Sequence, residues 1–554
     1  MIRKIYSITI LMSVLFSLIG KNLHSQESYR THKELSTILK QLNAQYPNIT
    51  RLNSITKTAG NKDIWVLEVG NSEVDNHPGI VIVGGVDGKY ISGPELALRF
   101  AEKLLKSSSE DSVQNLINSI TFYIIPNVSP DATDQYHASL KYDRDKNARP
   151  TDDDRDGRLN EDPYEDLDNN GIITALRIKD PKGEWITHPD DERVMIKADK
   201  NEGEKGQYIL ISEGIDNDGD KSYNEDGEGG ITFNKNMAYQ FEHFKPGAGD
   251  FPVSEIESKA VLDYLYDKWN TFAVFIFGPS DNLSIPLQHV KADAEHQIVT
   301  SILKDDAILN AYVSKKYNEL TGEKSNTQIT KSNGGFMQWA YFHYGRLSFS
   351  TPAFYVPEIK VKPDSIQANN KKNEKFDPEV NFLRWADSVI QEDYFLDWKA
   401  IDHPDFPDKH VEIGGYYPHV RINPPVTLLD SISDTHNRFI IWLASERPSI
   451  EIMNVHTEDL GKNLFRIELD IYNRGFLPAL CEIGERTRWV KKPKISLKLE
   501  EGQEIISGRT IQLLDELPGD SAHHLNWLIK EKGLISIEVG APQTGNQIIE
   551  VELK

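Results

Sequence analysis

Short apolar runs recur along the first two thirds of the chain and mark the strands of a buried sheet. Residues 80–83, 121–125 and 271–277 are each almost wholly apolar and lack the polar alternation of a half-exposed strand. Continuous runs of this kind are typical of strands that are covered on both faces. Stretches with helical periodicity separate them. Alternation of strands and helices predicts an α/β fold with a mainly parallel or mixed sheet between two helical layers.

The helices of this region carry recognisable start signals. Pro94 is suited to the first turn of a helix, because its missing N–H would have no partner there. Leu96 and Phe100 then follow on one face. Ser254, with Glu257 three residues later, predicts a capping box at the start of another helix.

The C-terminal part of the chain has a different pattern. Apolar and polar residues alternate strictly in 465–471, 535–539 and 549–553, as in strands with one face exposed to water. Turn residues separate these runs, so residues 430–554 are predicted to form a β-sandwich domain. The intervening segment 396–429 is interpreted as a docking linker.

The N-terminus has the layout of a secretory signal peptide. Arg3 and Lys4 precede an apolar stretch at 8–19, and Ser25 offers a small residue for cleavage. The stretch is shorter than the roughly 20 residues of a membrane span. We therefore expect residues 1–25 to be removed, which leaves an exported protein, periplasmic or extracellular, without a transmembrane span.

Composition narrows the range of partners. The chain has 554 residues and a net charge of −23, so its surface would repel the phosphates of nucleic acid. Cys481 is its one cysteine, which excludes an internal disulfide. It is interpreted as a packed core thiol rather than a nucleophile.

Three acidic loops are candidate calcium sites. In each loop, oxygen ligands alternate with other residues, and glycine follows in two of them at Gly157 and Gly171. Hard oxygen ligands followed by a glycine turn are typical of calcium loops. The match is incomplete, because the third loop has Lys221 at the glycine position and the first two lack the bidentate Glu at position 12. Solvated acidic loops without an ion are the alternative. The candidate ligands are Asp152, Asp154, Asp156, Asp166, Asp168, Asn170, Asp216, Asp218 and Asp220.

The order of five segments resembles that of the zinc carboxypeptidases of the carboxypeptidase A type. These segments are 84–95 (GGVDGKYISGPE), 126–131 (PNVSPD), 233–236 (FNKN), 254–255 (SE) and 334–341 (GGFMQWAY). The resemblance covers about residues 30–395. It implies a carboxypeptidase-like mixed sheet flanked by helices over residues 28–395, with the acidic loops as insertions at about 150–228. The tail resembles the β-domain attached to many bacterial members.

The same resemblance indicates that the chemistry has been lost. The family holds zinc with two His and one Glu, but Asp87 stands in place of the first His and Tyr90 in place of the Glu. The strand that should deliver the third ligand is followed by residues 278–280, which contain no His. Pro352 takes the place of the general base. Zinc is therefore expected for the family but not for this chain, and no catalytic residue is assigned.

Features of the substrate side persist. Arg144 lies where the family has an Arg that polarises the scissile carbonyl, and Asn234 and Lys235 match the clamp for the substrate carboxylate. Lys keeps the charge of the family's Arg but loses its bidentate geometry. The alternative is that all three are structural remnants.

Three hypotheses follow for the function. The leading one is a catalytically inactive carboxypeptidase-like protein that binds peptide or protein C-termini as a scaffold module. The first alternative is an active zinc metallocarboxypeptidase with a displaced metal site. The second is a calcium-stabilised surface protein with no ligand in the groove.

Overall fold

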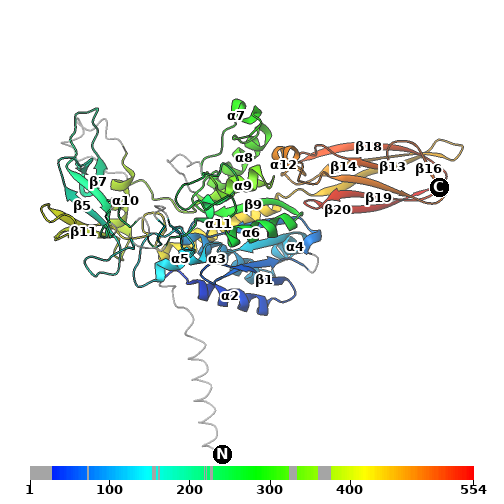
Figure 1. The fold of residues 1–554 in the computed structure, drawn as a ribbon. Coiled ribbons are helices and arrows are strands. Elements are labelled where there is room, and N and C mark those ends of the chain that lie inside the picture. Colours follow the sequence, from blue (N-terminus) through cyan, green and yellow to red (C-terminus); the bar gives the residue numbers. More distant parts are fainter. Residues whose placement is uncertain are drawn as a thin grey trace, which may run out of the picture.

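The computed structural model describes residues 28–71, 74–152, 157–159, 162–217, 219, 221–224, 227, 229–322, 333–359 and 376–554. The expected signal peptide, residues 1–25, lies outside these ranges. Within them, no helix has both the length and the apolar character needed to cross a bilayer. Figure 1 shows a central body, a lobe that contains β5, β7 and β11 on one side of it, and a layered pair of sheets on the other.

A six-stranded mixed sheet forms the centre of the body. Its order is β1 (Thr50–Lys57), β2 (Asp63–Val69), β4 (Thr121–Ile125), β3 (Gly79–Val83), β9 (Thr271–Phe277) and β10 (Leu347–Thr351). Strands β4, β3, β9 and β10 are parallel, while β1 and β2 join antiparallel at one edge. The three apolar runs of the sequence are thus three neighbouring inner strands, as the absence of polar alternation predicted.

Helices cover both faces of this sheet. One face packs against α2 (His32–Gln45), α3 (Ser92–Lys106), α4 (Asp111–Ser119), α8 (Lys304–Thr321) and α11 (Leu429–Ser445), while α10 (Pro378–Val389) lies beside β7 (Asp191–Lys197) of the lobe (Figure 1). The other packs against α6 (Ile256–Asp267), α9 (Phe336–Phe342) and the 3-10 turn η3 (Phe233–Lys235). Ile80 and Ile82 face the first layer and Val81 and Val83 the second, so each residue of β3 is buried. Short helices α5 (Pro130–Thr133), α7 (Lys291–Glu295) and α12 (Glu482–Thr487) complete the set with the turns η1 (Val74–Asn76), η2 (Asp134–His137) and η4 (Val426–Leu428).

A second six-stranded sheet forms the lobe. It contains β5 (Ala175–Lys179), β6 (Trp185–His188), β7 (Asp191–Lys197), β8 (Tyr208–Ser212), β11 (Phe395–Ile401) and β12 (Val411–Tyr416), in the order β11-β12-β5-β8-β6-β7. The segment 396–429, expected as a linker, therefore supplies two strands that pair with the acidic insertion. The reason is that β12 completes the hydrogen bonding of β5, from Val411 opposite Ile178 to Gly414 opposite Ala175.

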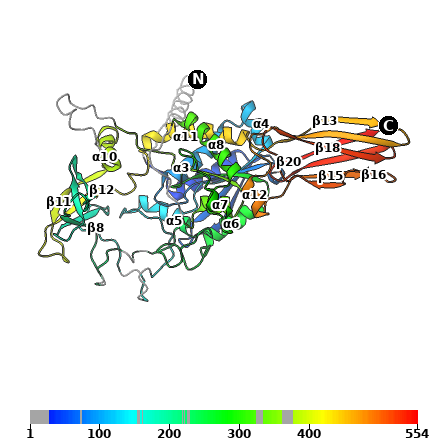
Figure 2. The same ribbon diagram turned by 90° about the horizontal axis from the view of Figure 1, so that it is seen from above.

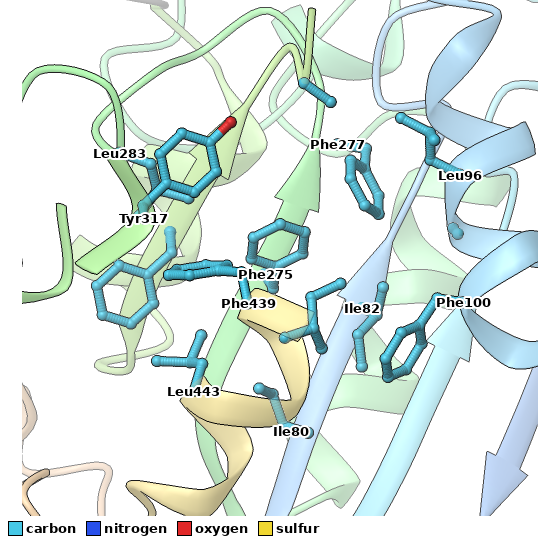
Figure 3. Close-up of a cluster of buried hydrophobic side chains, with 14 of the residues drawn as sticks. Ile80, Ile82, Leu96, Phe100, Phe275, Phe277, Leu283, Tyr317, Phe439 and Leu443 are labelled. Atoms are coloured by element: carbon cyan, nitrogen blue, oxygen red, sulfur yellow. The ribbon is translucent and has the colours of Figure 1, made fainter. Parts of the chain in front are cut away.

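Helix α11 belongs to the core of the body rather than to the C-terminal sheets. Phe439 and Leu443 on α11 lie against Phe275 of β9 and near Ile80 of β3 (Figure 3). The expected start of the sandwich at residue 430 thus falls inside a helix of the first layer. Its strands begin at residue 450, and the division of the chain into separate domains stays a prediction.

Two antiparallel four-stranded sheets form the C-terminal region, as seen at one end of the molecule in Figure 2. One contains β13 (Ile450–Asp459), β14 (Leu464–Asn473), β18 (Ser521–Lys530) and β16 (Glu504–Ser507); the other contains β17 (Ile511–Leu513), β15 (Lys494–Leu499), β19 (Gly533–Ala541) and β20 (Gly545–Leu553). Their alternate apolar residues share one core. The α/β fold followed by a β-sandwich is confirmed.

Candidate functional site

The carboxyl ends of β3, β4 and β9 meet at one point, where the motif segments pack backbone against backbone. A Cβ on Gly84 would lie 2.4 Å from the carbonyl oxygen of Pro126 and 2.5 Å from that of Gly93. A Cβ on Gly278, after β9, would lie 2.3 Å from Val86. These contacts explain the glycines of the motifs: nothing larger fits where the strand ends converge.

Two further motif segments close the same region. The Asn234 side chain accepts a hydrogen bond from the backbone N–H of Phe336 at 2.9 Å, and the N–H of Met237 donates to the carbonyl of Gly334 at 2.9 Å. Residues about 100 positions apart in the sequence are thereby held side by side. Four of the five segments chosen from the sequence contribute side chains to one buried core on the second face of the sheet.

At the expected metal position, the donor groups are a carboxylate and a phenol. Asp87 accepts a hydrogen bond from the backbone N–H of Lys89 at 3.0 Å. Burial, together with the nearby Asp145, raises the pKa of Asp87 to about 6, and burial raises the pKa of Tyr90 to about 12. A protonated phenol and a single carboxylate differ from the imidazole and carboxylate set of catalytic zinc. The residues present do not fit that ion.

The three histidines at 403, 410 and 419 do not meet in space. The His403 Nε2 lies 2.9 Å from the carbonyl oxygen of Gly214, and the His419 Nδ1 lies 3.4 Å from that of Lys89. The His410 side chain is 56% exposed. Among the described residues, the one group of three or more metal-ligand side chains is in the acidic lobe and contains no histidine. The groove therefore gains no replacement imidazoles from this segment.

Arg144 is directed at the backbone of its own loop. Its Nε donates to the carbonyl of Lys146 at 3.0 Å, and its Nη2 donates to that of Asn147 at 2.8 Å. The residue is buried, with 7% exposure. In this arrangement it shapes the groove wall, and a role at a substrate carbonyl stays a prediction.

Lys235 is the exposed member of the carboxylate clamp. Its side chain is 48% exposed, and its Nζ lies 3.8 Å from the Asp145 carboxylate. The Lys89 Nζ lies 3.9 Å from the same carboxylate oxygen. Two ammonium groups thus flank one carboxylate at distances longer than a direct hydrogen bond. Asn234, in contrast, is buried and ties η3 to α9.

A buried polar network, not anticipated from the sequence, occupies the end of β10 near Pro352. The hydroxyl groups of Thr351 and Tyr317 lie 2.8 Å apart, and the Tyr317 hydroxyl lies 2.9 Å from the His436 Nε2. The Tyr355 hydroxyl donates to Asp281 at 2.6 Å. Burial lowers the pKa of His436 to about 4, so its imidazole is neutral. The network satisfies buried polar groups where the family has its base.

The acidic lobe brings together part of the predicted calcium ligands. Asp154, Asp156, Asp218 and Asp220 lie outside the described residues. Asp152 accepts a hydrogen bond from the N–H of Gly157 at 3.0 Å, and Asp216 accepts one from Gly219 at 2.7 Å. Asp152 and Asp216 thus each accept a backbone hydrogen bond from a later glycine, and their role as calcium ligands stays a prediction.

The second loop forms a carboxylate cluster with a residue that the sequence did not reveal. Ligand atoms of Asp166, Asp168 and Glu213 all lie within 4.8 Å of one another. The Asp168 side chain is 7% exposed; its Oδ2 pairs with the Lys399 ammonium, while its Oδ1 has no hydrogen-bond partner among the described residues. Asn170 instead accepts a hydrogen bond from Ile172 at 2.8 Å. Pairing of β5 with β8 delivers Glu213, and spacing within the loop could not show this.

Glu213 is held in place by its own hydrogen bonds. It is fully buried, and its carboxylate accepts hydrogen bonds from the backbone N–H groups of Leu167 and Thr174, both at 2.8 Å. Burial raises the pKa of Glu213 even though these hydrogen bonds lower it, and the nearby Asp168 adds a smaller rise. A buried carboxylate beside two others is favoured when a cation neutralises it.

A comparison with known protein families shows to which family the chain belongs. A profile of the zinc carboxypeptidases matches residues 35–363. The chain belongs to the zinc carboxypeptidase family. A second profile, of a domain family of unknown function, matches residues 449–552, which are the strands of the sandwich.

Relatives of this zinc carboxypeptidase family member align with about a fifth of its length. Carboxypeptidase D of Anas platyrhynchos is 37% identical over 109 residues, which is 19% of this chain and 8% of the relative. The zinc carboxypeptidase of Saccharothrix mutabilis subsp. capreolus is 28% identical over 109 residues, which is 19% of this chain and 25% of the relative. The chain therefore matches a quarter or less of the length of these relatives.

Solved carboxypeptidase structures are also similar to the chain. Bovine thrombin-activatable fibrinolysis inhibitor in complex with tick carboxypeptidase inhibitor has 12% sequence identity and a TM-score of 0.39, covering 76% of this chain and 97% of that one. Carboxypeptidase A from Helicoverpa armigera has 13% identity and a TM-score of 0.37, covering 62% and 70%.

Proposed function

We propose that this family member is an exported, catalytically inactive carboxypeptidase-like protein that binds peptide or protein C-termini in the groove. The observation that carries the proposal is the donor set at the metal position, where Asp87 and Tyr90 stand among otherwise retained motif segments. Export would depend on residues 1–25.

The expected inactivity follows from the large rate contributions of the two groups that are missing, the zinc ion and the general base. Zinc lowers the pKa of a bound water from 15.7 to about 7, and a site without it lacks this source of hydroxide at neutral pH. Loss of a positioned general base costs typically another 10² to 10⁴ in rate. Pro352 has no titratable group to replace that base.

Binding of an anionic chain end is supported by the charges at the clamp. Lys235 and Lys89 both face the Asp145 carboxylate at almost 4 Å, so a second carboxylate has donors available nearby. A peptide C-terminus supplies that carboxylate, and the half-exposed side chain of Lys235 is accessible to it from solvent.

Two measurements test the proposal. Metal analysis of the purified protein should find zinc well below one equivalent. Incubation of the protein with a peptide library should release no C-terminal amino acids. Stoichiometric zinc with release that a chelator abolishes would establish the active alternative with displaced ligands.

The binding half of the proposal has its own experiment. Peptides with a free C-terminus should bind about tenfold more tightly than their amides, which corresponds to about 1.4 kcal/mol. Lys235→Ala should remove this difference, whereas Lys259→Ala, an exposed lysine on α6, should not. Equal affinity for free and amidated peptides would argue against the groove and favour a structural surface protein.

We also propose that the acidic lobe binds calcium, with Asp166, Asp168 and Glu213 as its best-defined ligands. Oxygen ligands of this kind suit calcium, and the burial of Asp168 and Glu213 supports a bound cation rather than a solvated loop. Calorimetric titration with calcium should give a saturable signal that Glu213→Gln abolishes. No heat and no rise in melting temperature would contradict it.

A further inference from the structure

A cavity of about 560 Å³ lies where the lobe meets the body, separate from the five motif segments. Its walls come from strands β5 to β8, β11 and β12 of the second sheet and from residues 142–143 and 417–422 of the body. Cavities of this size hold small-molecule ligands, and junctions between structural units are common places for them. The zinc carboxypeptidase profile ends at residue 363, before β11 and β12.

Aromatic side chains line much of this cavity. Tyr142 and Tyr164 stack with their ring centroids 4.2 Å apart and an interplanar angle of 29°. Trp185, Phe395 and Trp398 line other parts of the wall. Flat rings that are only partly buried present apolar faces together with polar edges. Such a wall suits a ligand that is itself ring-shaped, with a face of C–H groups.

The charged residues at the cavity already have partners. Arg193 forms ion pairs with Asp191 at 2.8 Å and with Asp387 at 2.9 Å. Arg421 pairs with Glu379 at 3.0 Å. The paired arginines give no net attraction for an anionic ligand, and the Asp143 carboxylate on the same wall accepts hydrogen bonds, so the occupant is expected to be a neutral hydrogen-bond donor. The paired groups still offer oxygen and nitrogen atoms to hydroxyl groups.

One buried acceptor at the wall also calls for a hydroxyl donor. His419 lines the cavity with 3% exposure, and its Nε2 has no hydrogen-bond partner among the described residues. Its Nδ1 lies 3.4 Å from the carbonyl oxygen of Lys89 and 3.5 Å from the Asp143 carboxylate, two acceptors that favour the tautomer with the proton on Nδ1 and Nε2 as the acceptor. A buried polar atom without a partner has a free-energy cost that a ligand hydroxyl removes.

We propose that this cavity is a binding site for a neutral saccharide, whose rings stack on the aromatic wall and whose hydroxyls reach His419 and the Glu379 carboxylate. The volume fits two to three sugar rings by order of magnitude. The site is independent of the proposed peptide groove, although His419 touches the backbone of Lys89 on the groove side. Either site could exist without the other.

Titration of the full chain with neutral trisaccharides tests this proposal. Maltotriose, cellotriose and triacetylchitotriose serve as probes, with tryptophan fluorescence and calorimetry as the readouts. At least one should bind with a dissociation constant on the order of 1 mM or lower. Trp398→Ala should weaken it about tenfold, which corresponds to about 1.4 kcal/mol and is within the range of a stacking contact. Phe251→Ala, an exposed aromatic residue outside the cavity, is the matched control.

Trp398 also donates a hydrogen bond to the carbonyl of Arg193, so its loss could disturb the lobe. Trp185→Ala on β6 therefore serves as a second variant, and circular dichroism checks the folding of both. Absence of binding by all three trisaccharides, unchanged affinity in a folded Trp185→Ala protein, or binding of an aromatic peptide in place of the sugars would each overturn the proposal.

Discussion

Replacement of Asp87 by Asn distinguishes a vestigial metal position from a working one. In the native protein, burial and Asp145 raise the pKa of Asp87 to about 6 from an ordinary 3.8. The charged form is therefore disfavoured in the folded state. Asn keeps the shape and can still accept the hydrogen bond from the N–H of Lys89, but it removes the charge. The variant is expected to be more stable than the parent at neutral pH.

The magnitude follows from the pKa change. A shift from 3.8 to about 6 corresponds to about 3 kcal/mol, at 1.36 kcal/mol per pH unit. Asp87 retains some contact with solvent, which screens part of this, so we expect about 1.5 kcal/mol. Because the folded pKa is the higher one, the destabilisation is absent below pH 4, grows between pH 4 and 6, and is complete above.

Thermal unfolding at pH 4.0 and 7.5 measures this difference. Asp87→Asn should raise the melting temperature by about 2 °C at pH 7.5 and leave it nearly unchanged at pH 4.0. Asp263→Asn, at an exposed carboxylate, is the control that should change neither value. If Asp87→Asn instead lowers the melting temperature at pH 7.5 and releases a bound metal, Asp87 is a ligand and the reasoning fails.

Three other outcomes follow from the same structure. Chelator should lower the melting temperature, by an amount equivalent to about 3 kcal/mol if calcium is at 100 times its dissociation constant, and Glu213→Gln should abolish the effect. Phe439→Ala should cost about 3–5 kcal/mol in denaturant unfolding of the body, because this buried side chain lies on the central sheet; a cost below 1 kcal/mol would contradict the placement of α11. His436 has a pKa lowered to about 4 from 6.5, so stability should fall as pH decreases between these values; His436→Gln should be less acid-sensitive, and an unchanged pH profile would refute the buried neutral imidazole.

Sequence patterns were sufficient to predict the elements whose residues are all buried. The inner strands β3, β4 and β9 were predicted because both faces are covered, and α3 begins at Ser92, close to the predicted start at Pro94. The predicted capping box failed for a tertiary reason. Ser254 lies 3.0 Å from the Asn236 amide and bonds the Glu255 carboxylate, and the helix begins at Ile256. A competing partner from the segment after η3 replaced the local one.

Strand pairing between segments that are distant in the sequence explains the features that could not be predicted from it. Glu213 reaches the second acidic loop because β8 pairs with β5, and β12 joins the same sheet from beyond residue 400. Neither pairing leaves a periodic signal in the loops themselves. The aromatic cavity has the same origin, since Trp185 and Trp398 are more than 200 positions apart. Groups of this kind become visible once strand order is known.

The motif residues of the groove fall into two groups, those that the backbone packing requires and those that would bind the metal. Gly84, Gly93 and Gly278 remain where a Cβ would come within about 3 Å of neighbouring atoms, so the backbone of the fold requires them with or without a metal. Asp87 and Tyr90 occupy the expected metal position, where a carboxylate and a phenol stand in place of the family's metal-binding residue types. Under the proposed function, the protein uses the folded groove rather than its hydrolytic chemistry, so only the first group of residues is required.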